Sequence, residues 1–544
     1  MNTRQLQTDK NQKLYHALLG ILLVCALAMM MLLSYWACKY SYYGAVDGRT
    51  RGVLVGDKTW AHIAVFLAAS LCTMGIDKVL MKKDKSQQEK ICLCTLIVTS
   101  VIAFILGVFY VCKNPYYPVG DQINTTAFAA YCRDGNFSML SIGGYVGMYQ
   151  QQKGLAILYE ILFTLFGDFN YRPAKILHVV WWILTILAGY GFLKLNTDRP
   201  VFRMLYCVMM LGCFPLLFYL PYIYGDVLSI SFGIILFYGV AAYEHSGQKR
   251  YIALASFAAG LAVLARKNTW IVLVAVAVYV LLVSLRKKKV RYLMAGTAIL
   301  LTAALSVKAV DVIYEVRSGY PSGVGVPSIL WVAMGLQETE GRAGVYNRYQ
   351  QATFTDYDCQ QELAAQQGKE YIRERLEEFS QDPGMAFDFF KNKLEGQWIE
   401  PMYAALESTE SFEEGAELSP VLESLYYGEL GRTIWKLTNY YQSILYLAGL
   451  MALVMLGFLW WKKKEVPISL WLPWIAVFGG FLFSILWEAK SRYVFPYCVF
   501  MILYAPEGLY QTGLLLCKLP KLRKFKKSGH TQDKGEEASL RETA

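Results

Sequence analysis

Long apolar segments alternate with short polar connections along most of the chain. Most of these segments hold about 17–25 residues, which is the length of helix that crosses the hydrocarbon core of a bilayer. The pattern therefore predicts an all-α polytopic membrane protein with about twelve transmembrane helices. The predicted spans are residues 15–37, 61–81, 91–111, 176–194, 201–220, 227–243, 250–265, 270–285, 291–312, 440–461, 467–487 and 493–515.

One apolar segment, Gly154–Phe166, is too short to be a span, with about 13 residues. Counting it as a crossing would move the basic cluster Lys194–Arg203 to the outer side of the membrane. We therefore expect a helix that lies along the outer membrane surface, inside a long first outer loop at residues 112–175.

Composition agrees with a membrane protein, since 55% of the residues are hydrophobic and only 17% are charged. A soluble protein of this length needs more charge to cover its surface. The net charge of +11 would suggest nucleic acid in a soluble chain. Here the basic residues cluster beside apolar segments, which is the pattern that orients membrane helices, so we expect membrane lipids and no nucleic acid as partners.

The basic connections predict the orientation of the helices. If the N-terminus is cytoplasmic, every strongly basic short connection falls on the cytoplasmic side, and both termini lie there. The connections concerned are residues 82–90, 194–200, 244–250, 286–291 and 461–465, together with the tail segment 518–527.

A second large outer loop differs from the rest of the chain in charge. Residues 315–435 hold 21 of the 42 acidic residues and nine basic ones. Segments 370–379 and 385–403 read as short helices separated by a turn at Asp382–Gly384. They predict a small helical extracytoplasmic cap.

An acidic residue stands where a predicted span leaves the membrane. Asp121 follows the apolar segment 91–111 in the aromatic, Pro- and Gly-containing sequence YYPVGDQ. A carboxylate at a membrane surface is costly to desolvate and is often placed there for chemistry. Asp121 could also simply cap a surface helix, because GDQ followed by INTTAF is also a good helix start.

Further polar residues occupy the short outer turns and the first outer loop. A carboxylate among them could accept a proton from a nucleophilic hydroxyl, cations could hold a phosphate, and tyrosines could stack on sugar rings. This combination suggests a lipid-phosphate donor from the membrane and a polar acceptor from outside. The candidate catalytic residues are Asp121 and Asp226, and the candidate substrate-binding residues are Gln122, Tyr149, Lys153, Arg172, Tyr224, Arg266, Lys267, Glu488 and Arg492.

This part of the chain resembles the bacterial GT-C glycosyltransferases in several features. They are the span that ends in GDQ, the sequences GGYVGMYQQQKGL and LFG, and the basic residue that opens the next span. The nearest in style are glycosyltransferase family 39, the protein mannosyltransferases and the aminoarabinose–lipid A transferases. The resemblance covers roughly residues 90–315, and beyond it only the architecture matches. It implies an enzyme of the bacterial cytoplasmic membrane that transfers a sugar, with inversion, from a polyprenyl phosphate to an extracytoplasmic glycan, lipid or protein.

The resemblance also implies residue roles. Asp121 matches the first-loop acid that acts as general base, Asp226 matches the second outer acid, and Arg266 or Lys267 matches a residue that contacts donor phosphate. Two departures stand out: Gln122 replaces a second acid, and QQQK replaces the usual proline-rich turn before Lys153. The implied organisation is two additional N-terminal helices (1–90), a seven-helix catalytic module (91–315), a cap (316–435), C-terminal helices (436–517) and a basic, partly disordered cytoplasmic tail (518–544).

Alternatives remain at this stage. A transporter or flippase predicts charges near the middle of spans and repeated halves, and a polymerase of lipid-linked glycans predicts arginines in two large outer loops. Asp226 could be a helix cap, Arg266 and Lys267 could anchor a helix end, and Glu488 and Arg492 could belong to a structural ion network. A divalent metal stays open, although no cluster of acids has ligand spacing.

Overall fold

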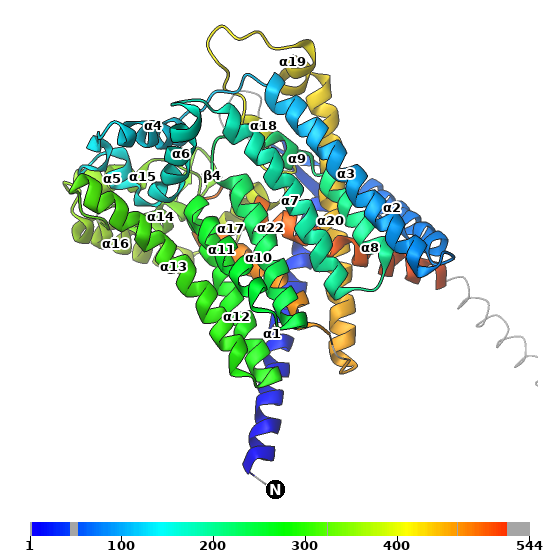
Figure 1. Cartoon of the computed structure of the whole chain (residues 1–544). Coiled ribbons are helices and arrows are strands. Elements are labelled where there is room, and N and C mark those ends of the chain that lie inside the picture. The colour runs from blue at the N-terminus through cyan, green and yellow to red at the C-terminus, as the bar shows by residue number, and fades with distance from the viewer. Residues whose placement is uncertain (1–2, 44–52, 324, 465, 519–544) are drawn as a thin grey trace, which may run out of the picture.

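Helices make up almost all of the secondary structure (Figure 1). The computed structural model describes residues 3–43, 53–323, 325–464 and 466–518, and for residues 3–10 it describes the backbone alone. Within these ranges the strands form two small antiparallel hairpins. One joins β1 (Tyr40–Tyr43) to β2 (Val53–Gly56), and the other joins β3 (Glu338–Thr339) to β4 (Arg342–Ala343). The predicted all-α class is confirmed, and most of the predicted tail, residues 519–544, lies outside the described residues.

Nine helices in the described part of the chain are long and apolar enough to cross a membrane. The prediction of a polytopic membrane protein is therefore confirmed at this level. Seven of them are α1 (Thr3–Lys39), α2 (Thr59–Leu80), α3 (Lys85–Lys113), α7 (Arg172–Asn196), α10 (Asp226–Ser246), α13 (Val290–Ser318) and α20 (Glu429–Trp461). The other two are α12 (Trp270–Lys287) and α21 (Leu472–Leu486), each counted with the helical turn before it, so that these spans cover Lys267–Lys287 and Ile468–Leu486.

Three of the twelve predicted spans are shorter or divided. Helix α11 (Lys249–Ala265) has 17 residues. The segment 201–220 is split into α8 (Pro200–Leu211) and α9 (Phe214–Phe218), and the segment 493–515 is split into α22 (Ser491–Met501) and the helical residues 505–518. Pro215 and Pro506 stand at the start of the two second pieces, where a missing backbone N–H does no harm. The number of crossings therefore stays a prediction.

Most of the short helices gather at one end of the bundle, which we call the cap end (Figure 1). It carries α4 (Asp121–Arg133), α5 (Tyr145–Met148), α6 (Lys153–Phe166), α14 (Ser328–Gly335), α15 (Tyr349–Asp356) and α16 (Gln361–Gln381). Helix α6 coincides with the predicted surface helix. The basic connection between α12 and α13 lies at the opposite end of the bundle, as does the C-terminal end of α20.

The predicted helices of the cap are present with shifted ends. Helix α16 begins earlier than segment 370–379, and α17 (Pro383–Trp398) ends earlier than segment 385–403. Asp382 separates them, and its side chain accepts a hydrogen bond of 2.9 Å from the backbone N–H of Met385. This is N-terminal capping by an aspartate, with Pro383 in the first turn of α17. The remaining cap helices are α18 (Ala405–Ser408) and α19 (Pro420–Tyr427).

Two glycines allow backbone contacts that assemble the cap end. A Cβ at Gly225 would lie 2.0 Å from the carbonyl oxygen of Ala265, so only glycine lets the turn before α10 meet the turn after α11. A Cβ at Gly335 would lie 2.3 Å from the carbonyl oxygen of Leu486. The end of α14 therefore packs directly on the end of α21. These contacts bring together segments that lie far apart in the sequence.

Candidate active site

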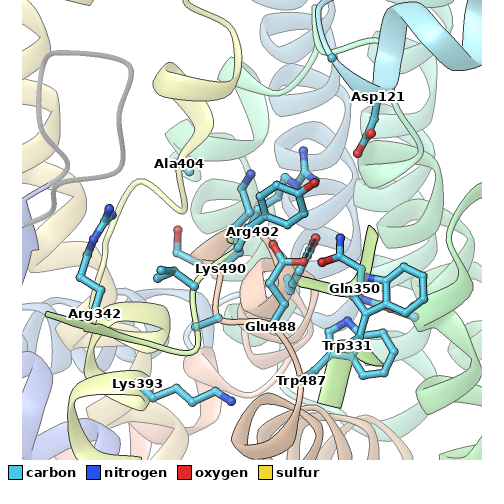
Figure 2. A pocket seen from close by; sticks show the side chains of 18 of the residues that line it. Asp121, Trp331, Arg342, Gln350, Lys393, Ala404, Trp487, Glu488, Lys490 and Arg492 are labelled. Atoms are coloured by element: carbon cyan, nitrogen blue, oxygen red, sulfur yellow. Dashed lines mark hydrogen bonds between the residues drawn. The ribbon is translucent and has the colours of Figure 1, made fainter. Parts of the chain in front are cut away.

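A cavity of about 1390 Å³ opens at the cap end (Figure 2). Five parts of the chain line it: the β1–β2 hairpin, the segment 120–152 with the start of α4, the turn 265–268 with Tyr224, the cap, and the segment 487–493. Its volume exceeds the roughly 300–1,000 Å³ of a typical small-molecule pocket. The cavity is therefore larger than one small ligand needs.

Asp121 lies on the wall of this cavity as the first residue of α4. The preceding Gly120 has a φ of 57°, a conformation that favours glycine, and it turns the chain into the helix. Gly120, and not Asp121, occupies the N-cap position. The Asp121 carboxylate is exposed and accepts a hydrogen bond of 2.8 Å from the Tyr145 hydroxyl. The carboxylate thus faces the cavity, while the positive end of the α4 dipole favours its charge.

A basic cluster forms another part of the cavity lining. Nη2 of Arg266 lies 3.4 Å from Oδ1 of Asp226, and Nε of Arg492 lies 3.9 Å from the same oxygen. The two guanidinium groups also lie 4.9 Å and 5.4 Å from the centre of the Tyr224 ring. One carboxylate shared by two arginines leaves a net positive charge, which suits an anionic ligand.

Lys267 and Lys490 add further positive charge to the lining. Glu488 lies beside them, is buried, and accepts a hydrogen bond of 3.3 Å from the Tyr493 hydroxyl. Burial raises the pKa of Glu488, and the charge of Asp121 raises it further, while Lys490 acts in the opposite direction. Glu488 and Asp121 both line the cavity.

The cap contributes buried ionisable groups to the opposite wall. Burial lowers the pKa of the Lys393 amine to about 7, and the amine donates a hydrogen bond to the Gly335 carbonyl. Burial also raises the pKa values of Glu400 and Glu407. The Glu400 carboxylate accepts hydrogen bonds of 2.8 and 2.6 Å from the backbone N–H groups of Met402 and Ala404.

A row of aromatic rings lines the cavity from Asp121 into the cap, and we call it the aromatic wall. Tyr145 packs on Tyr149 with ring centres 5.2 Å apart, and Tyr149 meets the edge of Trp331 at 6.2 Å. Trp331 stacks on Trp487, with centres 5.9 Å apart and planes inclined by 4°. The wall thus joins residues 145–149, α14 of the cap and the segment after α21 (Figure 2).

The structure brings most of the predicted site residues together. Four lie outside the lining, namely Gln122, Lys153, Arg172 and Asp226. Asp226 is only 3% exposed and sits behind the two arginines that it pairs with. The predicted site residues that do line the cavity are Asp121, Tyr149, Tyr224, Arg266, Lys267, Glu488 and Arg492.

The other three residues outside the lining have local roles or face away. Lys153 is buried, pairs with Asp311 and donates a hydrogen bond of 2.8 Å to Ser322, which ties α6 to α13. Gln122 is buried and accepts a hydrogen bond from the Tyr116 hydroxyl. Arg172 is exposed at the start of α7.

Several lining residues from the cap were not predicted. Spacing gave no sign of them, because they are scattered over several helices and the irregular connections between them. The one available signal was the rarity of basic residues in this acidic region, which could have drawn attention to three of the unpredicted positions. The cap residues concerned are Trp331, Arg342, Tyr346, Arg348, Gln350, Lys393, Glu400 and Glu407.

The described residues contain no group of three or more His, Cys, Asp or Glu side chains arranged to hold a metal ion. Comparison with known proteins yields no assignment either, because no family model, curated protein or solved structure matches the chain.

Proposed function

We propose that the protein is an integral membrane glycosyltransferase that moves a sugar from a polyprenyl-phosphate donor to an extracytoplasmic acceptor. The observation that carries this proposal is the position of Asp121 in one cavity with Arg266, Lys267, Lys490 and Arg492. A carboxylate base opposite a phosphate-binding cluster is what transfer from a sugar phosphate to a hydroxyl requires.

The reaction follows from this arrangement. Asp121 accepts the proton of an acceptor hydroxyl while the hydroxyl oxygen bonds to the anomeric carbon of the donor sugar. The bond between that carbon and the phosphate oxygen breaks, and the electron pair leaves on polyprenyl phosphate. Arg266 and Arg492 stabilise the negative charge that develops on the phosphate. Attack from the side opposite the leaving group inverts the anomeric centre.

Asp226 has a positioning role in this scheme. It does not line the cavity, so substrate does not reach it, and both arginines bracket one of its oxygens. Its charge holds the guanidinium groups in place and reduces their mutual repulsion. Asp121 is then the one acid of the predicted catalytic pair that touches substrate.

A second candidate is a polymerase of lipid-linked glycans, because the cap places Arg342 and Arg348 in the same cavity. Both activities use an outer cavity and a lipid-phosphate leaving group. They differ in product: a transferase adds a single sugar, whereas a polymerase lengthens a chain of repeats.

Reconstitution tests the proposed function. The protein in liposomes is supplied with a panel of polyprenyl-phosphate hexoses, pentoses and N-acetylhexosamines and with an extract of envelope glycans. The expected result is release of free polyprenyl phosphate from one donor and gain of one sugar by the acceptor. Products lengthened by whole repeats would favour the polymerase, and turnover of no donor would contradict both.

A further inference from the structure

The aromatic wall leads away from the proposed base. Tyr145 is the first ring of the wall. Its hydroxyl donates a hydrogen bond to Asp121, and its ring packs on Tyr149. From there the wall continues through Tyr149 to Trp331 and Trp487. A ligand that binds on the two tryptophans is therefore connected to the Asp121 carboxylate by a continuous row of aromatic rings.

The two tryptophans are held in place before any ligand binds. Gly335, four residues after Trp331, packs its backbone on that of Leu486, next to Trp487. The backbone N–H of Ala489 also donates a hydrogen bond of 2.7 Å to the carbonyl of Gly344, in the cap. The parallel rings are thus clamped between two backbone contacts. Such preorganisation lowers the entropy lost on binding.

Polar side chains border the aromatic rings. Gln350 lines the cavity, is 1% exposed, and its Oε1 has no hydrogen-bond partner among the described residues. Tyr149 and Tyr346 lie beside its side chain. Glu488 follows Trp487 directly and also lines the cavity. Figure 2 shows Gln350 and Glu488 beside the tryptophans.

This surface fits one kind of molecule. A sugar ring presents apolar C–H groups on its face and hydroxyls around its rim. The C–H face can cover an aromatic ring, while the hydroxyls reach an amide and a carboxylate that accept hydrogen bonds. An acyl chain would leave Oε1 of Gln350 without a hydrogen-bond partner, which is unfavourable in a buried site.

The wall belongs to the acceptor and not to the donor. In the proposed reaction the acceptor hydroxyl is the group that meets Asp121, and the wall begins at the tyrosine bonded to that carboxylate. The donor phosphate is instead placed by Arg266 and Arg492. Resting on the proposed function, we infer that the aromatic wall is the acceptor subsite and that the acceptor is a carbohydrate, bound by stacking on Trp331 and Trp487.

Saturation-transfer NMR with the full-length protein in detergent tests this inference without any turnover. The probes are methyl glycosides of glucose, galactose and mannose, together with N,N′-diacetylchitobiose. A tetrapeptide of serine and glycine serves as the comparison ligand. The protein variants are Trp331→Ala, Trp487→Ala, Gln350→Leu and Asp121→Asn, with the exposed Trp461→Ala as the matched control.

We expect ring C–H signals from at least one glycoside and none from the peptide. The dissociation constant should rise at least tenfold in Trp331→Ala and Trp487→Ala, rise less in Gln350→Leu, and stay unchanged in Trp461→Ala. Gln350→Leu keeps both tryptophans and tests the same site by a milder change. Weaker glycoside binding in this variant, with an unchanged unfolding temperature, separates a loss of binding from a loss of the fold. Absence of signal from every glycoside, or a dissociation constant equal to that of the wild type in both tryptophan variants, would overturn the inference.

The same experiment separates the two proposals. Asp121→Asn should bind the glycoside normally, since the wall is intact. Normal glycoside binding with no transferase activity in the wild-type protein would contradict the proposed function while leaving a carbohydrate site. Transferase activity that does not respond to the tryptophan substitutions would contradict the acceptor subsite alone.

Discussion

The Tyr145 hydroxyl donates a hydrogen bond of 2.8 Å to Oδ1 of Asp121, joining α5 to the first turn of α4. Burial raises the pKa of Tyr145, and the charge of Asp121 raises it further. The tyrosine therefore stays protonated across the physiological pH range and always donates. This contact fixes the direction in which the proposed base points into the cavity.

Replacing Tyr145 with Phe should slow sugar transfer while the aromatic wall remains. A hydrogen bond to a charged group contributes about 1.5–3 kcal/mol, which corresponds to a fall of roughly ten- to hundredfold in kcat. Steady-state kinetics with saturating donor measure it. Tyr131→Phe, an exposed tyrosine of α4, is the control and should have wild-type rates. An unchanged kcat in Tyr145→Phe would show that this contact does not orient a base.

Replacing Asp226 with Asn should weaken donor binding and lower stability. Removing the shared carboxylate leaves the buried Arg492 and the half-buried Arg266 without their counter-charge, and breaking a buried pair costs about 3–5 kcal/mol. The Kd for undecaprenyl phosphate is expected to rise at least tenfold, and the unfolding temperature to fall.

A double-mutant cycle tests the origin of that effect. Asp226→Asn and Arg266→Gln should be less than additive, because each removes the same ion pair. Arg172→Gln, at an exposed position outside the cavity, should combine additively with Asp226→Asn. Full additivity of the first pair would mean that Asp226 does not act through Arg266.

Much of the fold was predictable because helix length and hydrophobicity are set by the bilayer. The segments that became α1, α3 and α13 carry that signal without interruption. The segments 201–220 and 493–515 carry it too, but each is broken by a turn followed by a proline. Average hydropathy over a window does not detect such a break.

The candidate site was predictable where the chain makes short turns. Charges in the turns around residues 266 and 488 had to lie at helix ends, and they meet in the cavity. Orientation was not predictable: Asp226 and Lys153 begin helices, and only packing decides that their side chains point inward to Arg266 and Asp311. The contribution of the cap depends on contacts distant in sequence, such as Trp331 on Trp487.

Replacing Lys153 with Met should lower stability without affecting the donor. Lys153 pairs with Asp311 and donates a hydrogen bond to Ser322 outside the cavity lining, so its loss removes one of the polar contacts that hold α6 on α13. The expected result is a lower unfolding temperature and an unchanged Kd for undecaprenyl phosphate. A higher Kd for undecaprenyl phosphate with an unchanged unfolding temperature would show that Lys153 contributes to donor binding.

Replacing Lys393 with Met should affect stability in a pH-dependent way. The folded protein binds the Lys393 proton with a pKa of about 7, against 10.5 for a free lysine. Below pH 7 the Lys393 amine is charged in both the folded and the unfolded protein, so the full cost of burying this charge lowers the stability of the folded protein. Between pH 7 and 10.5 the unfolded state binds more protons, and stability rises with pH.

The gain in unfolding temperature from Lys393→Met should therefore be larger at pH 6 than at pH 9. Loss of the bond to Gly335 lowers stability equally at both values and does not affect this difference. Lys369→Met, at an exposed position of α16, should show no such dependence. Equal gains at pH 6 and pH 9 would show that Lys393 does not titrate in this range.

The central claim is that Asp121 is the base of a sugar transfer, and the most direct test is single-turnover transfer by Asp121→Asn in liposomes. Asparagine keeps the shape of the side chain and cannot accept the proton, so the rate should fall by about a hundred- to ten-thousandfold. The Kd values for undecaprenyl phosphate and for the methyl glycoside should stay within about threefold of wild type, because a base contributes little to ground-state binding. Transfer at close to the wild-type rate by Asp121→Asn would contradict the account.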